Sequence, residues 1–559
     1  MPANPPALFP DRQPVWRELD ELLSAPEFAT DTDGVAATYH RLQALGRTLG
    51  PARALHHQPG RMLAGMEWAG IVDPAMMHAA MVHFGVATTA FMDCGHPNPD
   101  LAPLLDDLDA LRAPGVIVAT ELGRGGSQMR MRTEARYNPD RDNFTLTTPD
   151  DAALKFMPNV SWTGLDRAAV VNARLIHNGT DHGVHAFACR LPHPQVRVTS
   201  IPGGGQVNLD FSLLRFDQAE IPAGWWLADT ATMTDGELTD PCTPHQRLAR
   251  SLGGVNAAVT SATVAMTAAA RACIAITYRF QVQRLTGPTE APAINLPAHS
   301  GELASAVARV FAATAYSDTV RDHYIAESII ADPDDDASYA PWLAANRDRT
   351  LAKVHAATTL EQVAGTCRRL CGAHGTLSTN RLTTYEGMAR SFHAAGGDTR
   401  LLLLEAGKQL AAHGTDATGN GQGHSPRQLL AFQERVLVSS LGPDPALADV
   451  EYLAGVHLAR RALETLDDLV AAHPGHFALL DPVRRLYGLD LAVDTAAWHL
   501  NYGSLRPGDL DRLQCSRAAA RDHVTSNLTA LVDALAVPPG RAGGAIGRRN
   551  YIRHAAAHA

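Results

Sequence analysis

Two glycine-rich segments carry groups suited to binding a phosphate or a dinucleotide. The first, Ala119-Thr-Glu-Leu-Gly-Arg-Gly-Gly-Ser127, follows the apolar run Gly115-Val-Ile-Val. Its glycines let backbone amides approach a ligand closely, and Thr120 and Ser127 add hydroxyl donors. A strand pattern follows rather than a helix, which excludes the dinucleotide fingerprint G-x-G-x-x-G. Taken alone, such a loop is most often an ordinary turn.

The second segment, Cys371-Gly-Ala-His-Gly375, ends a helical pattern whose last turn is basic. Its local interpretations are a helix stop of the Schellman type or a set of free amides that could hold an anion. Another helical pattern ends within Arg279 to Pro288 and includes Arg284. This guanidinium suits a phosphate, and solvated surface charge is the alternative.

The elements that must position these segments follow from hydrophobic periodicity. Apolar residues recur at helical spacing from about Trp16 to Leu111, and the period changes to two between Gly115 and Pro222. Strands are expected at Met129 to Ala135 and Val184 to Leu191. Helices return from Pro244 onward, and the clearest are Asn256 to Gln283, Gly301 to Ala315, Leu360 to Leu370 and Thr399 to Ala412.

We therefore predict an α+β protein that is mainly α-helical. The expected domains are a helical one over residues 1–114, a mostly antiparallel β domain over 115–235 and a helical bundle over 236–415. Glycine-rich composition predicts a flexible linker at 416–426, and a second helical domain follows at 427–559.

Composition excludes several classes of function. The 559 residues carry a net charge of −10 without long like-charge blocks, which argues against nucleic acid as a partner. The longest apolar stretch, Val264 to Phe280, is interrupted by two arginines, so no membrane span is expected. Seven cysteines without a C-x-x-C pair predict neither a metal site nor a disulfide framework. The first residues lack a secretion signal and the last lack a peroxisomal address, so we expect a cytoplasmic protein.

Several short motifs in a fixed order resemble the acyl-CoA oxidases of the acyl-CoA dehydrogenase superfamily. They are Thr120-Glu-Leu-Gly, Asn138-Pro-Asp-Arg-Asp-Asn-Phe, Lys155-Phe-Met-Pro, Ala173-Arg-Leu-Ile-His-Asn-Gly-Thr-Asp-His-Gly-Val-His, Leu213-Leu-Arg-Phe-Asp, Ala219-Glu-Ile-Pro222, Cys371-Gly-Ala-His-Gly375 and Gly543-Gly-Ala-Ile-Gly547. The resemblance covers nearly the whole chain. It implies an acyl-CoA dehydrogenase-like helical domain, a β-barrel-like domain, a helical bundle and the extra C-terminal helical domain of the oxidases.

The resemblance also implies FAD as cofactor, shared between copies of the chain in a homodimer or homotetramer. Thr120 would contact the flavin, and the segment Lys155 to Asn159 would pass the isoalloxazine, with Asn159 in place of a glycine. Arg284 and the Cys371 to Gly375 turn would hold the pyrophosphate and adenosine from the neighbouring subunit. The predicted cofactor-binding residues are Thr120, Ser127, Asn159, Arg284, Gly372, His374, Gly375, Asp398 and Thr399.

The base that such enzymes use is missing from its expected position. In the family, a glutamate that removes the substrate's α-proton lies 21 residues after the last glycine of the second turn, which is Gly396 here. Thr384-Tyr-Glu-Gly387 reproduces the letters of the family motif ten residues early, so Glu386 is an alternative base. A minority of the superfamily places its base on an earlier helix, where this sequence has Ala258 and no carboxylate from Ser251 to Gln281.

We therefore predict an FAD-dependent oxidoreductase that acts on the Cα–Cβ bond of a carbonyl-activated acyl or peptidyl substrate, with O2 as acceptor, in specialised metabolism. Decarboxylation of a β-keto acid would generate the enolate without a base. Desaturation and epoxidation would then follow, as in the flavoenzymes of this superfamily that form epoxyketones. The alternatives are a conventional acyl-CoA oxidase or dehydrogenase that uses Glu386, and a non-catalytic flavin-binding paralogue in a heteromer. The acyl carrier would be CoA, a carrier protein or neither.

Overall fold

The N-terminal part of the chain is helical, as its periodicity predicts. The computed structural model describes residues 8–28, 34–95, 98–202, 207–234, 237–326, 346–417, 425–442 and 445–556. Between the first helix and the β domain, a π-helical turn at Met81–Ala87 joins α5 to α6. The helices are α1 (Gln13–Asp20), α2 (Val35–Leu49), α3 (Ala52–His56), α4 (Pro59–Val72), α5 (Pro74–Ala80), α6 (Thr88–Cys94) and α7 (Ala102–Asp109).

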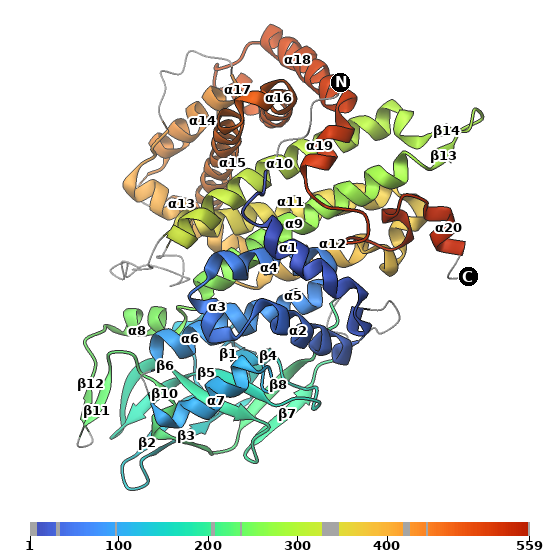
Figure 1. Cartoon of the computed structure of the whole chain (residues 1–559). Helices are drawn as coiled ribbons and strands as arrows, with labels where there is room; N and C mark the ends of the chain where they lie inside the picture. The colour runs from blue at the N-terminus through green and yellow to red at the C-terminus, as the bar shows by residue number, and fades with distance from the viewer. Residues whose placement is uncertain are drawn as a thin grey trace.

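The middle of the chain forms two curled sheets that enclose their own apolar core, at the lower end of the molecule in Figure 1. The larger sheet has the order β10-β6-β5-β2-β3-β9, with β1 also paired to β5, and the smaller has the order β4-β8-β7. Only the β1–β5 and β2–β5 pairs are parallel among these strands. The strands are β1 (Gly115–Val118), β2 (Glu134–Asn138), β3 (Asn143–Thr147), β4 (Lys155–Asn159), β5 (Arg167–His177), β6 (Thr180–Leu191), β7 (Val196–Ser200), β8 (Phe211–Phe216), β9 (Ala219–Pro222) and β10 (Trp226–Leu227).

Two details of the β domain differ from the sequence prediction. Met129 to Ala135 was expected as a strand, but Gln128–Arg130 is a 3-10 turn and β2 begins only at Glu134. The domain also extends past the expected limit at residue 235, because a last hairpin of β11 (Thr232–Thr234) and β12 (Glu237–Thr239) precedes the bundle.

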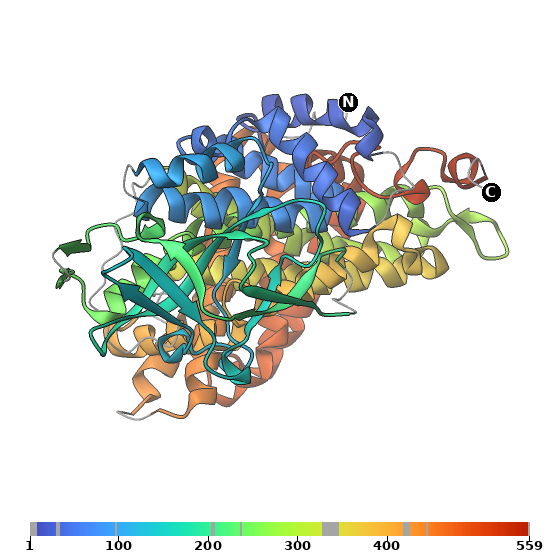
Figure 2. The ribbon, with the colours of Figure 1, turned by 90° about the horizontal axis from the view of Figure 1, so that it is seen from below.

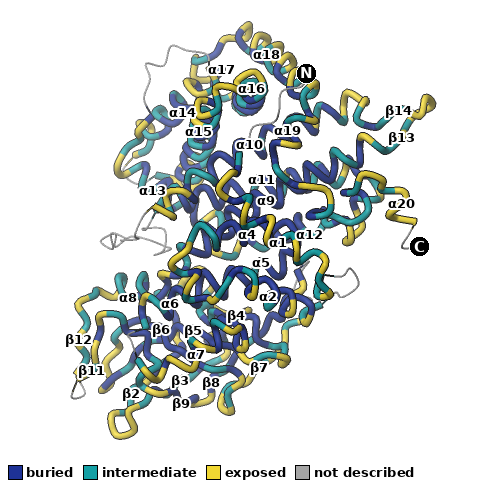
Figure 3. The backbone as a smooth tube through the Cα atoms, viewed as in Figure 1, coloured by how far each residue is buried: buried dark blue, intermediate teal, exposed yellow. Residues whose placement is uncertain are grey.

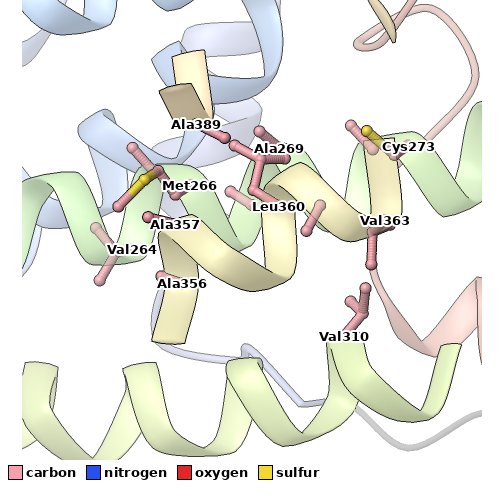
Figure 4. Packing of buried hydrophobic residues seen from close by; sticks show 14 of the residues in the cluster. Val264, Met266, Ala269, Cys273, Val310, Ala356, Ala357, Leu360, Val363 and Ala389 are labelled. Carbon is pink, nitrogen blue, oxygen red and sulfur yellow. The ribbon is translucent and has the colours of Figure 1, made fainter. Parts of the chain in front are cut away.

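A bundle of long helices forms the centre of the molecule. It contains α9 (Val255–Gln281), α10 (Pro297–Ala326), α11 (Arg347–Leu370), α12 (Leu382–Ala394) and α13 (Thr399–His413). The helix α9 is buried along most of its length, as the dark tube in Figure 3 shows. Small side chains such as Ala269, Ala356 and Ala357 let α9 and α11 pack closely, with Val310 of α10 and Ala389 of α12 alongside (Figure 4).

Most of the C-terminal helices lie on the opposite side of the bundle from the β domain, at the upper end of the molecule in Figure 1, and only α20 lies apart from them near the C-terminus. They are α14 (Pro426–Ser440), α15 (Leu447–Ala472), α16 (Phe477–Asp494), α17 (Ala496–Asn501), α18 (Pro507–Ser526), α19 (Leu528–Ala534) and α20 (Tyr551–Ala556). Most of the predicted linker at 416–426 lies outside the described residues.

Two described segments are long and apolar enough to span a membrane, Pro74–Cys94 and Val255–Gln281. Both are covered by the rest of the molecule, since 89% and 100% of their most apolar windows are buried. Their hydrophobicity is therefore that of core helices.

Candidate active site

The glycine-rich loop after β1 is fixed by a buried ion pair. The Glu121 carboxylate accepts hydrogen bonds from the amides of Arg132 (2.9 Å) and Thr133 (2.7 Å) and from the Thr133 hydroxyl (2.7 Å). Lys155 Nζ lies 3.6 Å from Glu121 and donates to the carbonyl oxygens of Ala119 and Asn172. Burial lowers the pKa of Lys155 to about 8, against the opposing effect of Glu121. These contacts hold the backbone on both sides of Thr120.

Thr120 itself is half-buried and is available to a ligand. Its carbonyl oxygen accepts a hydrogen bond from Phe156 N at 2.9 Å, which joins the loop to β4. Its hydroxyl has no hydrogen-bond partner among the described residues. Ser127, at the far end of the loop, is exposed.

The strand β4 is irregular where the sequence predicted a flavin-facing segment. Its pairing with β8 is interrupted by a bulge between Phe156 and Asn159, and Met157 has a φ of 55° with 41% of its surface exposed. Asn159 is buried, and its Nδ2 has no partner among the described residues. An unpaired buried amide is costly, so Nδ2 is suited to donating a hydrogen bond to a bound group.

A network that the sequence reasoning missed holds Asn159 in place. Its carbonyl oxygen accepts hydrogen bonds from Arg167 Nε (3.2 Å) and the Tyr39 hydroxyl (3.4 Å). Tyr39 also donates to Asp210 at 2.7 Å, stacks on Trp162 and lies under the Arg167 guanidinium. These residues come from α2 and from three separate parts of the β domain, so no local pattern links them.

The position expected for the missing base lies in a turn between α12 and α13. Gly396 is exposed and has a φ of 68°, in the left-handed region that favours glycine. A Cβ atom there would lie 3.8 Å from Val259 Cγ2 of α9 and 4.0 Å from Lys353 Cε of α11. Lys353 Nζ donates to the carbonyl oxygen of Gly397 at 2.7 Å. The turn therefore rests on both helices and leaves open space for a side chain.

Asp398 and Thr399 end this turn and have partners within the chain. The Asp398 carboxylate caps α13 by accepting hydrogen bonds from the amides of Arg400 (2.9 Å) and Leu401 (3.3 Å). The Thr399 hydroxyl lies 3.0 Å from His393 Nδ1. A Cβ atom on Gly126 would lie 3.1 Å from Leu401 Cδ1, so the loop after β1 and the start of α13 are neighbours.

Glu386 lies one residue after Tyr385 on α12 and is held by two arginines. Its carboxylate accepts hydrogen bonds from Arg368 Nε at 3.1 Å and Arg390 Nη2 at 2.7 Å. Only 13% of its side chain is exposed. The contact with Arg368 joins α12 to α11, and both arginines neutralise the charge of this carboxylate.

The residues predicted to hold a pyrophosphate also come together. Gly372 has a φ of 58°, and a Cβ atom there would lie 3.4 Å from Arg284 Nη1. The only side-chain hydrogen bond that Arg284 makes with described residues is a long one to the Leu370 carbonyl oxygen (3.5 Å). A Cβ atom on Gly375 would lie 2.2 Å from the Arg368 carbonyl oxygen, so only glycine fits there. His374 packs between two rings that the sequence reasoning missed, those of Phe280 and Tyr551.

These two groups of residues lie at opposite ends of α9. Val259 is near its start, beside Gly396, and Phe280 is near its end, beside His374. The helix rise places the two ends about 30 Å apart. Figure 1 and Figure 2 agree, because the β13–β14 hairpin (Leu285–Thr286 with Ala291–Pro292) and α20 lie at the far side from the β domain. One chain thus presents two separate half-sites.

Comparison with known proteins shows similarity to acyl-CoA oxidases. Residues 254–411 match the family described as acyl-CoA oxidase, C-alpha1 domain, and this range contains Val259, Lys353 and Gly396. This part of the chain is therefore similar to an acyl-CoA oxidase domain. It is 29% identical to peroxisomal acyl-coenzyme A oxidase 1 of Arabidopsis thaliana over 47% of this chain and 41% of the relative. It is also 29% identical to human peroxisomal acyl-coenzyme A oxidase 3, over 63% of this chain and 52% of the relative. The aligned parts thus span less than two thirds of these relatives.

The acyl-CoA oxidase fold extends over nearly the whole chain. Acyl-CoA oxidase 1 from Yarrowia lipolytica superposes with a TM-score of 0.80 at 19% identity, covering 96% of this chain and 88% of that one. Acyl-CoA oxidase 2 of Caenorhabditis elegans, solved with FAD, ascaroside-CoA and ATP, superposes with a TM-score of 0.77 at 15% identity, covering 98% and 89%. The predicted fold class is therefore confirmed.

Proposed function

We propose that this chain is an FAD-dependent oxidoreductase that oxidises the Cα–Cβ bond of a carbonyl-activated acyl or peptidyl substrate without a protein carboxylate as α-proton base. The observation that carries the proposal is the environment of Gly396. Of the two positions where a base is expected, Gly396 lies against Val259, the residue that follows the other position, Ala258. Neither position has a carboxylate, and the alternative Glu386 is paired with two arginines.

The residues present fit FAD. The free Thr120 hydroxyl and the unpaired Asn159 Nδ2 suit the flavin ring, and Arg284 with the glycine turn at Gly372 suits the pyrophosphate. When bound, FAD would accept a hydride from the substrate's β-carbon and would pass the electrons to O2. The bound FAD and ascaroside-CoA of the nematode oxidase support this cofactor and an activated acyl chain as the substrate.

The two half-sites support a shared cofactor. Because Thr120 and Arg284 belong to groups at opposite ends of α9, one cofactor that uses both must lie between two copies of the chain. We therefore propose a homodimer, or a tetramer built from such dimers, in which each FAD contacts the β domain of one copy and Arg284 of the other.

Decarboxylation of a β-keto acid supplies the carbanion that a missing base cannot generate. The bond between the α-carbon and the carboxylate breaks, CO2 leaves, and the electron pair stays on the α-carbon as an enolate. If the α-carbon of the β-keto acid carries an alkyl substituent, loss of a hydride from the β-carbon of that substituent then gives an enone. In an epoxidation step, one oxygen atom of O2 enters the C=C bond and the other leaves as water, with the two electrons removed in the desaturation. No step requires a protein base on the α-carbon.

Product analysis tests this proposal. The FAD-loaded protein is incubated aerobically with a saturated acyl-CoA and with an α-alkyl β-keto acid of matched chain length, and the products are followed by mass spectrometry and CO2 release. We expect CO2 with an enone or epoxide from the β-keto acid, and no enoyl product from the acyl-CoA. Enoyl-CoA formation without CO2 would instead support conventional acyl-CoA oxidation. No product from either substrate would favour the non-catalytic alternative.

A further inference from the structure

The fully buried side chain of Lys353 is a charged group beside the expected active site that has no role in the proposed function. The sequence has only three lysines among 48 lysines and arginines, and two of the three, Lys155 and Lys353, are fully buried. Lys155 is explained by its contacts with Glu121 and two carbonyl oxygens. Lys353 has no carboxylate within ion-pair distance among the described residues.

Lys353 lies next to the position of the missing side chain. Its Cε would be 4.0 Å from a Cβ atom on residue 396, and its Nζ donates one hydrogen bond, to the Gly397 carbonyl oxygen at 2.7 Å. An ammonium group has three donors, so this contact leaves capacity for another acceptor. Gly396 is exposed and adds no side chain, and a Cβ atom there would meet only Val259 and Lys353 within 4 Å.

The surrounding elements offer few compensating charges. The adjoining length of α9, from Val255 to Ala270, contains no charged residue. On α12, Arg390 pairs with Glu386, and His393 pairs with Glu361 and Thr399. Burial lowers the pKa of Lys353 to about 7, and the negative charge of Asp398 opposes this shift. Lys353 is thus a cation whose charge is weakly stabilised by the protein alone.

We infer that Lys353 binds the carboxylate of the substrate, so that the substrate's own carboxylate fills the place of the enzyme carboxylate that Gly396 lacks. The inference rests on the proposed function and names its substrate class, an acid whose carboxylate is attached to the α-carbon. In proton abstraction, the group that faces the α-carbon is a base, and the expected one is a carboxylate. In decarboxylation, the leaving group on the α-carbon is itself an anion, and its partner must be a cation.

The weak stabilisation of the Lys353 ammonium by the protein also suits the departure of CO2. The carboxylate stabilises the ammonium when the substrate binds, and the negative charge moves to the enolate oxygen when the C–C bond breaks. A more strongly ionised pair would stabilise the carboxylate and oppose this step. Lys353 neither gains nor loses a proton during decarboxylation, so its role is to bind and orient the substrate.

A binding measurement tests this role without turnover. The probe is a malonic half-amide with an alkyl chain on the amide nitrogen. It has a carboxylate on the α-carbon but does not decarboxylate readily, and the control probe is its methyl ester. Binding to the FAD-loaded protein is followed by the change in flavin absorbance. Lys353→Met should weaken binding of the carboxylate about 30-fold or more, the usual loss when one partner of a buried charge pair is removed, and should change ester binding less than threefold.

Two further variants and the pH dependence of binding distinguish a loss of the positive charge from a loss of folding. Lys353→Arg retains a positive charge and should bind the carboxylate more tightly than Lys353→Met, whereas Lys408→Met is a control on α13 and should match the wild type. Wild-type affinity should fall as pH rises through about 7, because only the ammonium form attracts the carboxylate. If Lys353→Met prevents folding, as judged by FAD content and thermal melting, the arginine variant and the wild-type pH profile decide.

Three results would overturn the inference. They are carboxylate binding within threefold of wild type in Lys353→Met, equal losses for acid and ester, and wild-type affinity that rises with pH. The last result would make the neutral amine the active form and Lys353 a base. If CO2 is released but Lys353→Met binds normally, only this inference fails, whereas enoyl-CoA formation without CO2 defeats the proposed function itself.

Discussion

Gly396 combines open space with a backbone conformation that resists side chains. We expect Gly396→Ala to cost roughly 1–2 kcal/mol of folding free energy, because a φ of 68° is unfavourable for other residues, while a Cβ atom meets no atom closer than 3.8 Å. Gly396→Glu should have a similar cost but also abolish turnover of the β-keto acid, since its carboxylate would pair with Lys353 and repel that of the substrate. Thermal melting separates the first effect from the second. Equal turnover by both variants would contradict the proposed place of the substrate carboxylate.

Glu386 gives a complementary prediction. Because two arginines hold its carboxylate, Glu386→Gln should reduce stability by about 1 kcal/mol and leave the rate of flavin reduction within about threefold of wild type. Removing a true general base typically reduces the rate about 10²–10⁴-fold. Stopped-flow measurement of flavin reduction distinguishes the two, with Glu361→Gln as a control on α11. A rate loss of the larger size would restore the conventional mechanism.

Residue types and spacing predict some of the site but not its neighbours. Gly396 follows from counting within a motif and Arg284 and Gly372 from resemblance to the family, and the structure brings Arg284 and Gly372 close together. The Tyr39–Asp210 hydrogen bond joins residues 171 positions apart, and nothing local marks it. Lys353 was missed for the same reason, because its proximity to residue 396 depends on how α11 packs beneath the turn.

At the scale of elements, the period-two pattern correctly locates the β domain but misplaces one strand. The alternation Met129-Arg-Met-Arg predicts a strand, yet the amides of Arg132 and Thr133 bond to the Glu121 carboxylate instead of a neighbouring strand. A buried side chain thus replaces the sheet as the partner of this backbone. Helix positions were more reliable, since α9 and α13 follow from long apolar periodicity, but α11 begins at Arg347 rather than near Leu360.

The Glu121–Lys155 pair should be a principal support of the β domain. Glu121→Ala leaves Lys155 and three donors without their partner, and breaking such a buried pair typically costs about 3–5 kcal/mol. We expect a lower melting temperature and reduced FAD content, because the same contacts fix the backbone around Thr120. The exposed Glu220, paired with Arg141, is the matched control, and Glu220→Ala should cost less than about 1 kcal/mol. Equal effects of the two variants would show that the pair has no special role.

At the scale of the whole molecule, the two half-sites predict that FAD binding depends on association of two copies. Arg284→Ala should leave the melting behaviour of the apoprotein unchanged and weaken FAD binding at least about tenfold, because a charge-assisted contact to the pyrophosphate is lost. The exposed Arg197 provides a control, since Arg197→Ala should bind FAD normally. Light scattering together with flavin absorbance checks both. A monomer that retains stoichiometric FAD would contradict the shared site.

The whole fold could be anticipated because its motifs occur in the order of the acyl-CoA oxidases, and the superposition over 96% of the chain confirms it. The reaction could not be read from the fold in the same way, since fold and cofactor are compatible with several reactions at the α-carbon. The distinction depends on which group faces that carbon, and here the candidates are a glycine, a paired glutamate and a buried lysine.

An anaerobic single turnover tests the central claim most directly. The FAD-loaded protein is mixed with an α-alkyl β-keto acid or with a saturated acyl-CoA of matched length, while flavin absorbance and released CO2 are recorded together. We expect the β-keto acid to bleach the flavin, with one CO2 released per flavin reduced. The result should be the same in wild type and Glu386→Gln. The acyl-CoA should not bleach the flavin. Bleaching by the acyl-CoA without CO2, lost in Glu386→Gln, would contradict this expectation.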